Sequence, residues 1–236
     1  MELGLQQTAN PERELNHTVD DVTYARYPIR TKIVPIGYSY MTLIKESVVP
    51  YFQKGDILAI SEKVISICQQ RVVHESQVNP SLLAKIICKF VTKYPDDVGF
   101  ENPRKMQVAI NESGWLRIIF AVIGGGIMKF IFRKPGYFYR IAGNQINVID
   151  GFNPIAIPPF NEYAMLAPAN PNKVCNEIEG EFGIPTTIVD ASNIATAILG
   201  KSKGVKFDDH HLQLLLNGNP MGQGDEQTPM ILIRKI

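Results

Sequence analysis

Cysteine is scarce in this sequence, and neither sign of charge is in clear excess. Only three cysteines occur among 236 residues, and none belongs to a Cys-x-x-Cys pair, so neither a disulfide framework nor a structural zinc site is expected. The 24 Lys and Arg residues are balanced by 23 Asp and Glu residues, which is typical neither of nucleic-acid binding nor of disorder. These absences favour an ordinary globular protein of the cytoplasm without a nucleic-acid partner.

Several sequence signals are missing as well. The N-terminal residues lack the apolar core that a signal peptide needs. The complete Gly-x-x-x-x-Gly-Lys-Ser/Thr motif of a P-loop is absent, and no Gly-x-Gly-x-x-Gly follows an expected strand, which argues against nicotinamide cofactors. No Ser, His and Asp set stands in a nucleophile-elbow context. Nucleophilic catalysis by the protein is therefore not expected.

The longest apolar run, residues 118–132, is too short to predict a membrane span. Its uncharged part ends at Met128, well before the ~20 residues that a spanning helix requires. Gly124, Gly125 and Gly126 interrupt it, and adjacent glycines are poor helix formers. We expect a buried strand, a glycine turn and a second strand here, with membrane contact as a minor alternative.

The order of the remaining patterns favours an α+β fold with mixed or antiparallel sheets. Residues 1–24 are polar and are expected to form a flexible tail, followed by a single domain over residues 25–236. Alternating or continuous apolar runs predict strands at 31–38, 54–61, 144–150, 186–190 and 229–234. Helical spacing or helix-end signals predict helices at 41–52, 62–73, 79–94, 172–183, 192–200 and 208–218.

Acidic side chains stand where several of these strands begin or end. Asp150 follows the run "INVI", Asp190 follows "TTIV", and Asp225 and Glu226 precede the strand that starts near Met230. A carboxylate at a strand end is held on a stiff element but faces a loop, which suits a ligand of a hard cation. If these ends meet, their oxygens and that of Gln223 could hold Mg²⁺ or Mn²⁺.

Each acid also has a simpler interpretation. Asp150 precedes a glycine in a common turn dipeptide, Asp190 could cap a following helix, and Asp225 with Glu226 could form a solvated hairpin tip. The neighbouring Gly222 and Gly224 favour the functional reading, because glycines let backbone N–H groups approach a phosphate closely.

Four stretches in this order, "KGDILAISEKVIS", "NVIDGFN", "TTIVDASN" and "MGQGDEQTPMILIR", resemble the coenzyme F420:L-glutamate ligases. The terminal stretch is similar to that of a bacterial subgroup, and the likeness runs from about residue 33 to the C-terminus. The resemblance implies an unusual α+β fold and an intertwined homodimer. It also implies an enzyme that uses GTP with Mg²⁺ or Mn²⁺ to attach glutamate to a deazaflavin coenzyme precursor through an acyl phosphate.

The resemblance carries residue roles as well. It retains Asp150 and Asp190 as metal ligands and puts Gln223 where the family has a ligating glutamate, with Asp225 and Glu226 close enough to replace it. The residues that it assigns to nucleotide or phosphate binding, with Lys63 standing in for a lost family lysine, are Lys63, Ser66, Asn153, Ser192, Asn193, Gly222 and Gly224.

The chain also departs from the family pattern. Ile67 replaces the family's lysine and Ala191 a metal-contacting threonine. Losing a cation that neutralises phosphate weakens nucleotide binding or redirects it. Two functions therefore stay open. The first is a nucleotide- and metal-dependent carboxylate–amine ligase using GTP or ATP. The second is a ligase-like scaffold that binds a metabolite, a protein partner or a membrane surface without catalysis, as the altered residues 66–70 and the apolar triple-glycine segment suggest. A metal-dependent phosphoester hydrolase is a third, weaker option.

Overall fold

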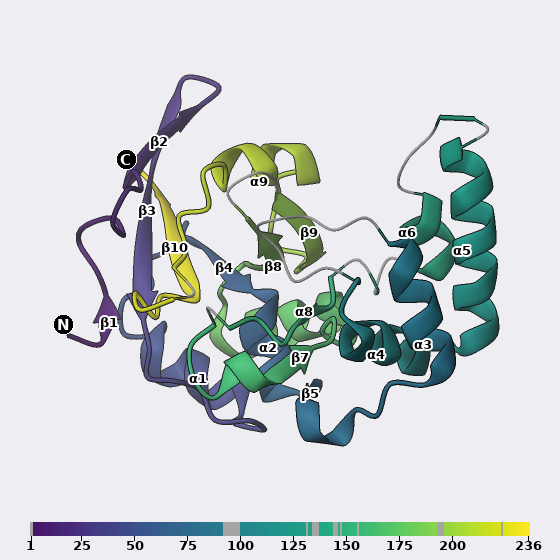
Figure 1. Cartoon of the computed structure of the whole chain (residues 1–236). Helices are drawn as coiled ribbons and strands as arrows, with labels where there is room; N and C mark the ends of the chain where they lie inside the picture. Colours follow the sequence, from purple (N-terminus) through teal and green to yellow (C-terminus); the bar gives the residue numbers. More distant parts are fainter. Residues whose placement is uncertain are drawn as a thin grey trace. The chain divides into compact units, whose positions relative to one another are not determined.

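The computed structural model describes residues 2–91, 100–130, 132–133, 137–143, 146, 148–154, 156–192, 196–222 and 224–236, as Figure 1 shows. These residues form two compact units, the first from residues 1–70 with 168–236 and the second from residues 71–167. The candidate residues Asn193 and Gln223 lie outside the described part of the chain. The expectation that residues 25–236 form one domain stays a prediction, because each unit is described by itself.

A seven-stranded sheet forms the centre of the first unit, with neighbours in the order β1-β3-β10-β4-β8-β9 and β2 beside β3. Its strands are β1 Gly4–Leu5, β2 Asn16–Val19, β3 Val22–Arg30, β4 Ile57–Ser61, β8 Thr186–Ala191, β9 Thr196–Lys201 and β10 Met230–Lys235. Only the β4–β8 pairing is parallel; the other pairings are antiparallel. The long apolar runs at β4 and β10 agree with their central, two-sided burial in the sheet.

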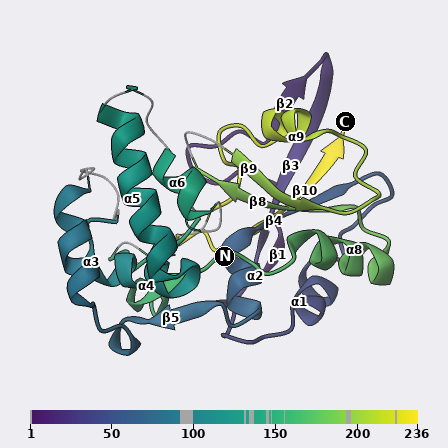
Figure 2. The ribbon, with the colours of Figure 1, turned by 90° about the vertical axis from the view of Figure 1, so that its right-hand side faces the viewer.

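Helices cover both faces of this sheet (Figure 2). They are α1 Tyr40–Ser47, α2 Glu62–Cys68, α8 Pro171–Phe182 and α9 Asp209–Leu215. Leu212 and Leu215 of α9 pack on one face with Val189, Ile231 and Ile233, and α1, α2 and α8 lie on the other face. The α9 helix begins where expected, because the Asp208 side chain accepts the His211 N–H at 2.8 Å.

The N-terminal segment belongs to the sheet rather than forming a loosely held tail. β1 and β2 both pair with β3, and the buried side chain of Asn10 donates to the Pro220 carbonyl at 2.9 Å and to Thr228 Oγ1 at 2.8 Å. The polar composition of residues 1–24 was the reason for expecting a tail. Edge strands can be polar because only one of their faces needs to be buried.

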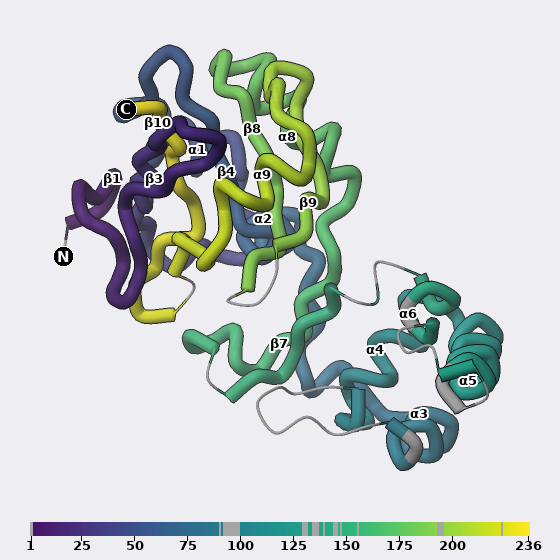
Figure 3. Tube along the Cα trace, turned by 90° about the horizontal axis from the view of Figure 1, so that it is seen from above, coloured from purple at the N-terminus to yellow at the C-terminus, as the bar shows by residue number. Residues whose placement is uncertain are grey.

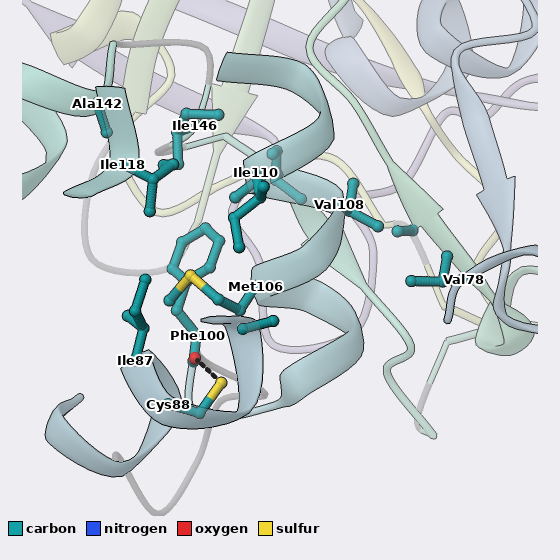
Figure 4. Packing of buried hydrophobic residues seen from close by; sticks show 14 of the residues in the cluster. Val78, Ile87, Cys88, Phe100, Met106, Val108, Ile110, Ile118, Ala142 and Ile146 are labelled. Carbon is teal, nitrogen blue, oxygen red and sulfur yellow. Dashed lines mark hydrogen bonds between the residues drawn. The ribbon is translucent and has the colours of Figure 1, made fainter. Parts of the chain in front are cut away.

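The second unit combines a small sheet with a cluster of helices, and Figure 3 shows these helices gathered in one group. Its sheet has the order β5-β7-β6. The strands are β5 Val72–His74, β6 Asp150–Gly151 and β7 Tyr163–Met165, and the helices are α3 Leu82–Ile87, α4 Pro103–Ser113, α5 Trp115–Phe130 and α6 Tyr137–Ala142. Single 3-10 turns lie at Glu75–Gln77, Cys88–Phe90 and Phe160–Glu162. Figure 4 shows the core, where Phe100, Met106, Ile110 and Ile118 pack together and Cys88 Sγ donates to the Phe100 carbonyl at 3.2 Å.

The α+β prediction with mixed and antiparallel sheets is confirmed. In the described part of residues 144–150 the predicted strand is present only at Asp150, and three other element predictions are wrong. Residues 31–38 form no strand, since Pro35 lacks an N–H and Gly37 has a φ of 80°. Residues 192–200 form no helix over their described part; instead β9 pairs with β8 along the edge of the sheet. Residues 118–130 are helical in α5 instead of forming two strands.

The glycines of α5 explain that third difference. A Cβ on Gly124 would lie 2.6 Å from Ile141 Cδ1, and one on Gly125 would lie 3.0 Å from the Phe138 backbone nitrogen. The two glycines therefore let α6 approach the α5 backbone closely, and this packing outweighs their poor helix propensity. Burial of Ile118 and Ala121 on the core side of α5 adds to the same effect.

Among the described residues, no single helix is long and apolar enough to cross a membrane. Taken together, α4 and residues 115–128 of α5 are long and apolar enough to cross a membrane, but the two helices meet at a bend of 113°.

Candidate functional site

One edge of the seven-stranded sheet brings together several of the predicted site residues. The carboxyl ends of the parallel strands β4 and β8 lie side by side, with Ser61 opposite Val189. β10 runs antiparallel to β4, with Met230 opposite Ile60, so the loop that precedes β10 reaches the same edge. Adjacent strands are about 4.8 Å apart, which separates β10 from β8 by about 10 Å. Asp190 and the loop with Asp225 and Glu226 therefore share this edge.

Asp190 lies near the end of β8 rather than at the cap of a following helix. It is paired in register with Ala197 of β9. Its neighbours Val189 and Ala191 pack in the core on the α9 side, so strand alternation directs Asp190 to the opposite, partly exposed face. The carboxylate is thus placed on a rigid strand at the sheet edge. Ser192, two residues after Asp190, is exposed.

Sequence reasoning missed an acid at this edge. Glu62 follows Ser61 directly, begins α2 and is only 4% exposed. Ser61 of β4 is in register with Val189 of β8. Glu62 directly follows Ser61, as Asp190 directly follows Val189, so both acids lie at the same end of the two strands. The signal was present in the sequence, since Glu62 follows the apolar run "ILAIS" as Asp190 follows "TTIV".

The loop before β10 is a tightly bonded hairpin. The Gly222 N–H donates to Thr228 Oγ1 at 2.9 Å, and the Thr228 N–H donates to the Gly222 carbonyl at 2.8 Å. The loop is fixed on both sides, because the Thr31 N–H donates to the Gln227 carbonyl and the Ser61 N–H to the Pro229 carbonyl, each at 2.9 Å. The loop therefore presents its acids from a fixed base.

Glu226 folds back over the glycines of this hairpin. Its carboxylate accepts the Gly224 N–H at 3.1 Å, and a Cβ on Gly222 would lie 2.5 Å from Glu226 Cβ. Gly222 is thus needed for the close approach of Glu226, and its N–H is already used by Thr228. The neighbouring Asp225 is exposed, and its carbonyl accepts from Arg30 Nη2 at 3.2 Å.

Two nucleotide-binding candidates lie on α2, which starts from the same edge. The predicted helix is present, so Lys63 does precede Ile67 by one turn. Lys63 is partly exposed, whereas Ser66 is buried at 1% exposure.

Asp150 and Asn153 belong to the second unit. Asp150 is the first residue of β6 and pairs with Met165, and the Asn153 carbonyl accepts the Ala156 N–H at 3.0 Å. A Cβ on Gly151 would lie 2.8 Å from Ala164 Cβ, so this glycine permits close pairing of β6 and β7. Convergence of Asp150 with Asp190 stays a prediction.

The structure also limits the chemistry of other groups. Among the described residues, no three His, Cys, Asp or Glu side chains gather as a metal-binding group. Burial raises the pKa of the Cys68 and Cys175 thiols to about 12, so both stay protonated and weakly nucleophilic at neutral pH. The tripeptide Gly200-Lys201-Ser202 does not form a phosphate-binding loop, because it leads out of β9 and Lys201 Nζ pairs with Asp209 at 2.7 Å.

Comparison with known families places the protein in the class of ligases. Residues 28–189 match the family described as F420-0:Gamma-glutamyl ligase. Because this match spans more than half of the chain, the protein belongs to that family. No curated protein matches the chain. The matched region contains Lys63, Ser66 and Asp150, and it ends one residue before Asp190.

Proposed function

We propose that this protein is a nucleotide- and divalent-metal-dependent carboxylate–amine ligase that joins glutamate or a similar amine to an acid through an acyl phosphate. GTP or ATP would be the phosphate donor. The observation that carries the proposal is the shared sheet edge, which presents Asp190, Glu62 and the loop with Asp225 and Glu226. Family membership supports the ligase class.

The residues at this edge fit Mg²⁺ or Mn²⁺. Mg²⁺ is commonly held by one or two carboxylates together with substrate phosphates and water, so a cage of three protein ligands is not required. Asp190 supplies a carboxylate from a rigid strand, and Asp225 or Glu226 supplies a second from the hairpin. When bound, the ion would spread the negative charge that develops on the transferring phosphoryl group.

The chain's own residues would orient the phosphates. Lys63 lies on the first turn of α2 and would place a positive charge beside them. The Gly224 N–H, which donates to Glu226, could exchange that carboxylate for a phosphate oxygen. The proposal gives Gly222 no such role, because its N–H donates to Thr228 Oγ1 inside the hairpin.

The proposed reaction has two balanced steps. An oxygen of the substrate carboxylate attacks the terminal phosphorus, and the nucleoside diphosphate leaves. The amine nitrogen then attacks the acyl carbon, inorganic phosphate leaves, and the nitrogen loses a proton as the amide forms. Closely held reactants are the main contribution a protein makes to such transfers.

A thermal-shift measurement with Mn²⁺ and GTP or ATP tests binding. Ligand at about 100 times its Kd stabilises a protein by about 2.7 kcal/mol, which raises the Tm of a chain of this size by about 5–10 °C. We expect this rise in the parent only when metal and nucleotide are both present, and its loss in Asp190→Asn. Asp209→Asn is the matched control, because Asp209 is an exposed acid on α9 paired with Lys201. No metal-dependent rise in the parent would exclude the ligase.

A second candidate function is binding without catalysis. It is favoured by the occupied N–H groups of Gly222 and Gly224 and by the isoleucine at position 67 in place of the family's lysine. Release of inorganic phosphate that depends on both an acid and an amine supports the ligase, whereas nucleotide binding without such release supports the scaffold. The homodimer that the family resemblance implies is a further proposal, measured by light scattering during size-exclusion chromatography.

A further inference from the structure

A stripe of large apolar side chains is exposed along one face of α5. Leu116, Phe120, Ile123 and Ile127 are 53%, 65%, 54% and 45% exposed. Their spacing of four, three and four residues places them on one side of the helix. Trp115, at the start of the same helix, is 56% exposed. Contiguous apolar surface of this kind on a folded protein marks an interaction site.

The opposite side of α5 is already used for packing. Ile118 and Ala121 are fully buried in the core of the second unit, and Gly124 and Gly125 contact α6. Arg117 Nε also donates to the Ile141 carbonyl near the end of α6, at 2.8 Å. The helix is therefore anchored by its inner face, and the apolar stripe is the face that remains outward.

The charges that flank this stripe along the chain are all of one sign. Residues 113–149 contain five Lys and Arg residues and no Asp or Glu. Of these five, Arg117, Arg133 and Arg140 are described and exposed. The whole second unit has 11 Lys and Arg residues against 7 Asp and Glu residues, whereas the first unit has 13 against 16.

We propose that the exposed face of α5, with its flanking arginines, binds the surface of an anionic lipid bilayer. An amphipathic helix with apolar side chains on one face and cations beside them lies in the plane of the membrane interface, with its apolar face among the acyl chains. Cations near such a surface add attraction to anionic lipids. At 16 residues the helix is about 24 Å long, which suits lying in the interface and falls short of spanning the bilayer.

Charge also decides against a second copy of the chain as the occupant. Pairing two α5 faces would bring together two surfaces flanked by cations, and like charges across an interface disfavour association. An anionic bilayer supplies the complementary charge as well as an apolar environment. This proposal is independent of the ligase reaction, because its residues all belong to the second unit and none is assigned to the reaction.

The sequence supplies its own reporter for this binding. Trp115 is the only tryptophan in the chain, and it lies half exposed at the start of α5. Tryptophan prefers the membrane–water interface, and moving its indole from water to that interface shifts its emission to shorter wavelength. The full-length protein therefore reports insertion of this helix without a label.

The experiment adds vesicles of phosphatidylcholine, with or without phosphatidylglycerol, to the full chain, and follows flotation together with tryptophan emission. We expect the protein to float with the anionic vesicles, with a blue shift that high salt reduces. Phe120→Glu should weaken binding by about tenfold or more, since it removes an aromatic ring from the acyl chains and adds a repelled charge. Ile236→Glu, a similarly exposed position in the first unit, should bind as the parent does.

Three results would overturn the proposal. They are absence of binding to anionic vesicles, equal binding to neutral and anionic vesicles, and equal binding by Phe120→Glu when its far-UV circular dichroism and Tm match those of the parent. Concentration-dependent dimerisation that Phe120→Glu abolishes, without vesicle binding, would identify a second copy as the occupant and would also refute it.

Discussion

Replacing Asp56 should cost the first unit about 3 kcal/mol of stability. The Asp56 side chain is 1% exposed, and its two oxygens accept from Arg234 Nε at 2.8 Å and Arg234 Nη2 at 2.7 Å. Asp56 Oδ2 also accepts the Gln53 N–H at 2.9 Å. The pair joins the start of β4 to the end of β10, so it fixes two central strands of the sheet.

The magnitude follows from what each partner loses. Removing one member of a buried ion pair costs about 3–5 kcal/mol. Arg234 is 20% exposed, so water can reach part of the charge that the substitution leaves behind. The guanidinium also keeps its contact with the Tyr27 ring, 5.2 Å from the ring centroid. The low end of this range therefore applies to Asp56→Ala. Asp56→Asn keeps the volume and one acceptor oxygen, and should cost about half as much.

Urea unfolding followed by far-UV circular dichroism measures this effect. In thermal unfolding followed by the same signal, Asp56→Ala should lower the Tm by about 6–12 °C. Asp209→Asn, which breaks an exposed pair with Lys201, should cost less than about 1 kcal/mol. In a double-mutant cycle, Arg234→Met should add little once Asp56 is already alanine. If Asp56→Ala and Asp209→Asn unfold at the same urea concentration, the buried pair does not stabilise the sheet as described.

Two further predictions concern α5 and pH. Gly126→Ala should stabilise the protein by up to about 1 kcal/mol, because a Cβ there meets nothing within 4 Å. Gly125→Ala should instead destabilise it by about 1–3 kcal/mol, because its Cβ would contact Phe138. Equal urea midpoints for the two variants would contradict the packing of α6 on α5. Burial and the charge of Arg26 lower the pKa of His17 below 6.5, so the unfolded chain binds a proton more readily than the folded chain. Stability should be intact above pH 6.5 and fall as the pH drops below that value, and His17→Gln should lose less stability than the parent on acidification from about pH 7.5 to about pH 5.5 in the same unfolding assay.

Elements whose local pattern and tertiary role agree could be predicted from the sequence. The continuous apolar runs at β4 and β10 indicate central strands, and Asp208 with the following apolar spacing indicates α9. Prediction failed where packing between distant segments decided the outcome. Glycine propensity spoke against a helix at α5, but contact of Gly125 with α6 stabilises it. At β9, the local pattern was typical of a helix, yet pairing with β8 made it a strand.

The candidate site, too, could be predicted only in part from the sequence. Asp150, Asp190, Asp225 and Glu226 were expected to meet because each lies beside a buried strand. The register of β10, β4 and β8 places the strand ends beside Asp190, Asp225 and Glu226 at one edge, whereas convergence with Asp150 stays a prediction. The internal hydrogen bond of Gly222 could not be foreseen, since it depends on the hairpin closing on Thr228. Glu62 could have been found, because it satisfies the same strand-end rule that selected Asp190.

The balanced charge of the whole chain is the least informative of the sequence observations. It argued against a nucleic-acid partner, yet it conceals a second unit with an excess of cations and a first unit with an excess of acids. Electrostatic attraction at physiological salt is screened beyond about 8 Å, so a surface responds to the charges beside it and not to the sum over the chain. Residues 113–149, with five cations and no acid, therefore determine how α5 meets an anionic bilayer. Vesicle binding should then show the salt dependence of a patch with several charges, far steeper than a net charge of +1 would produce.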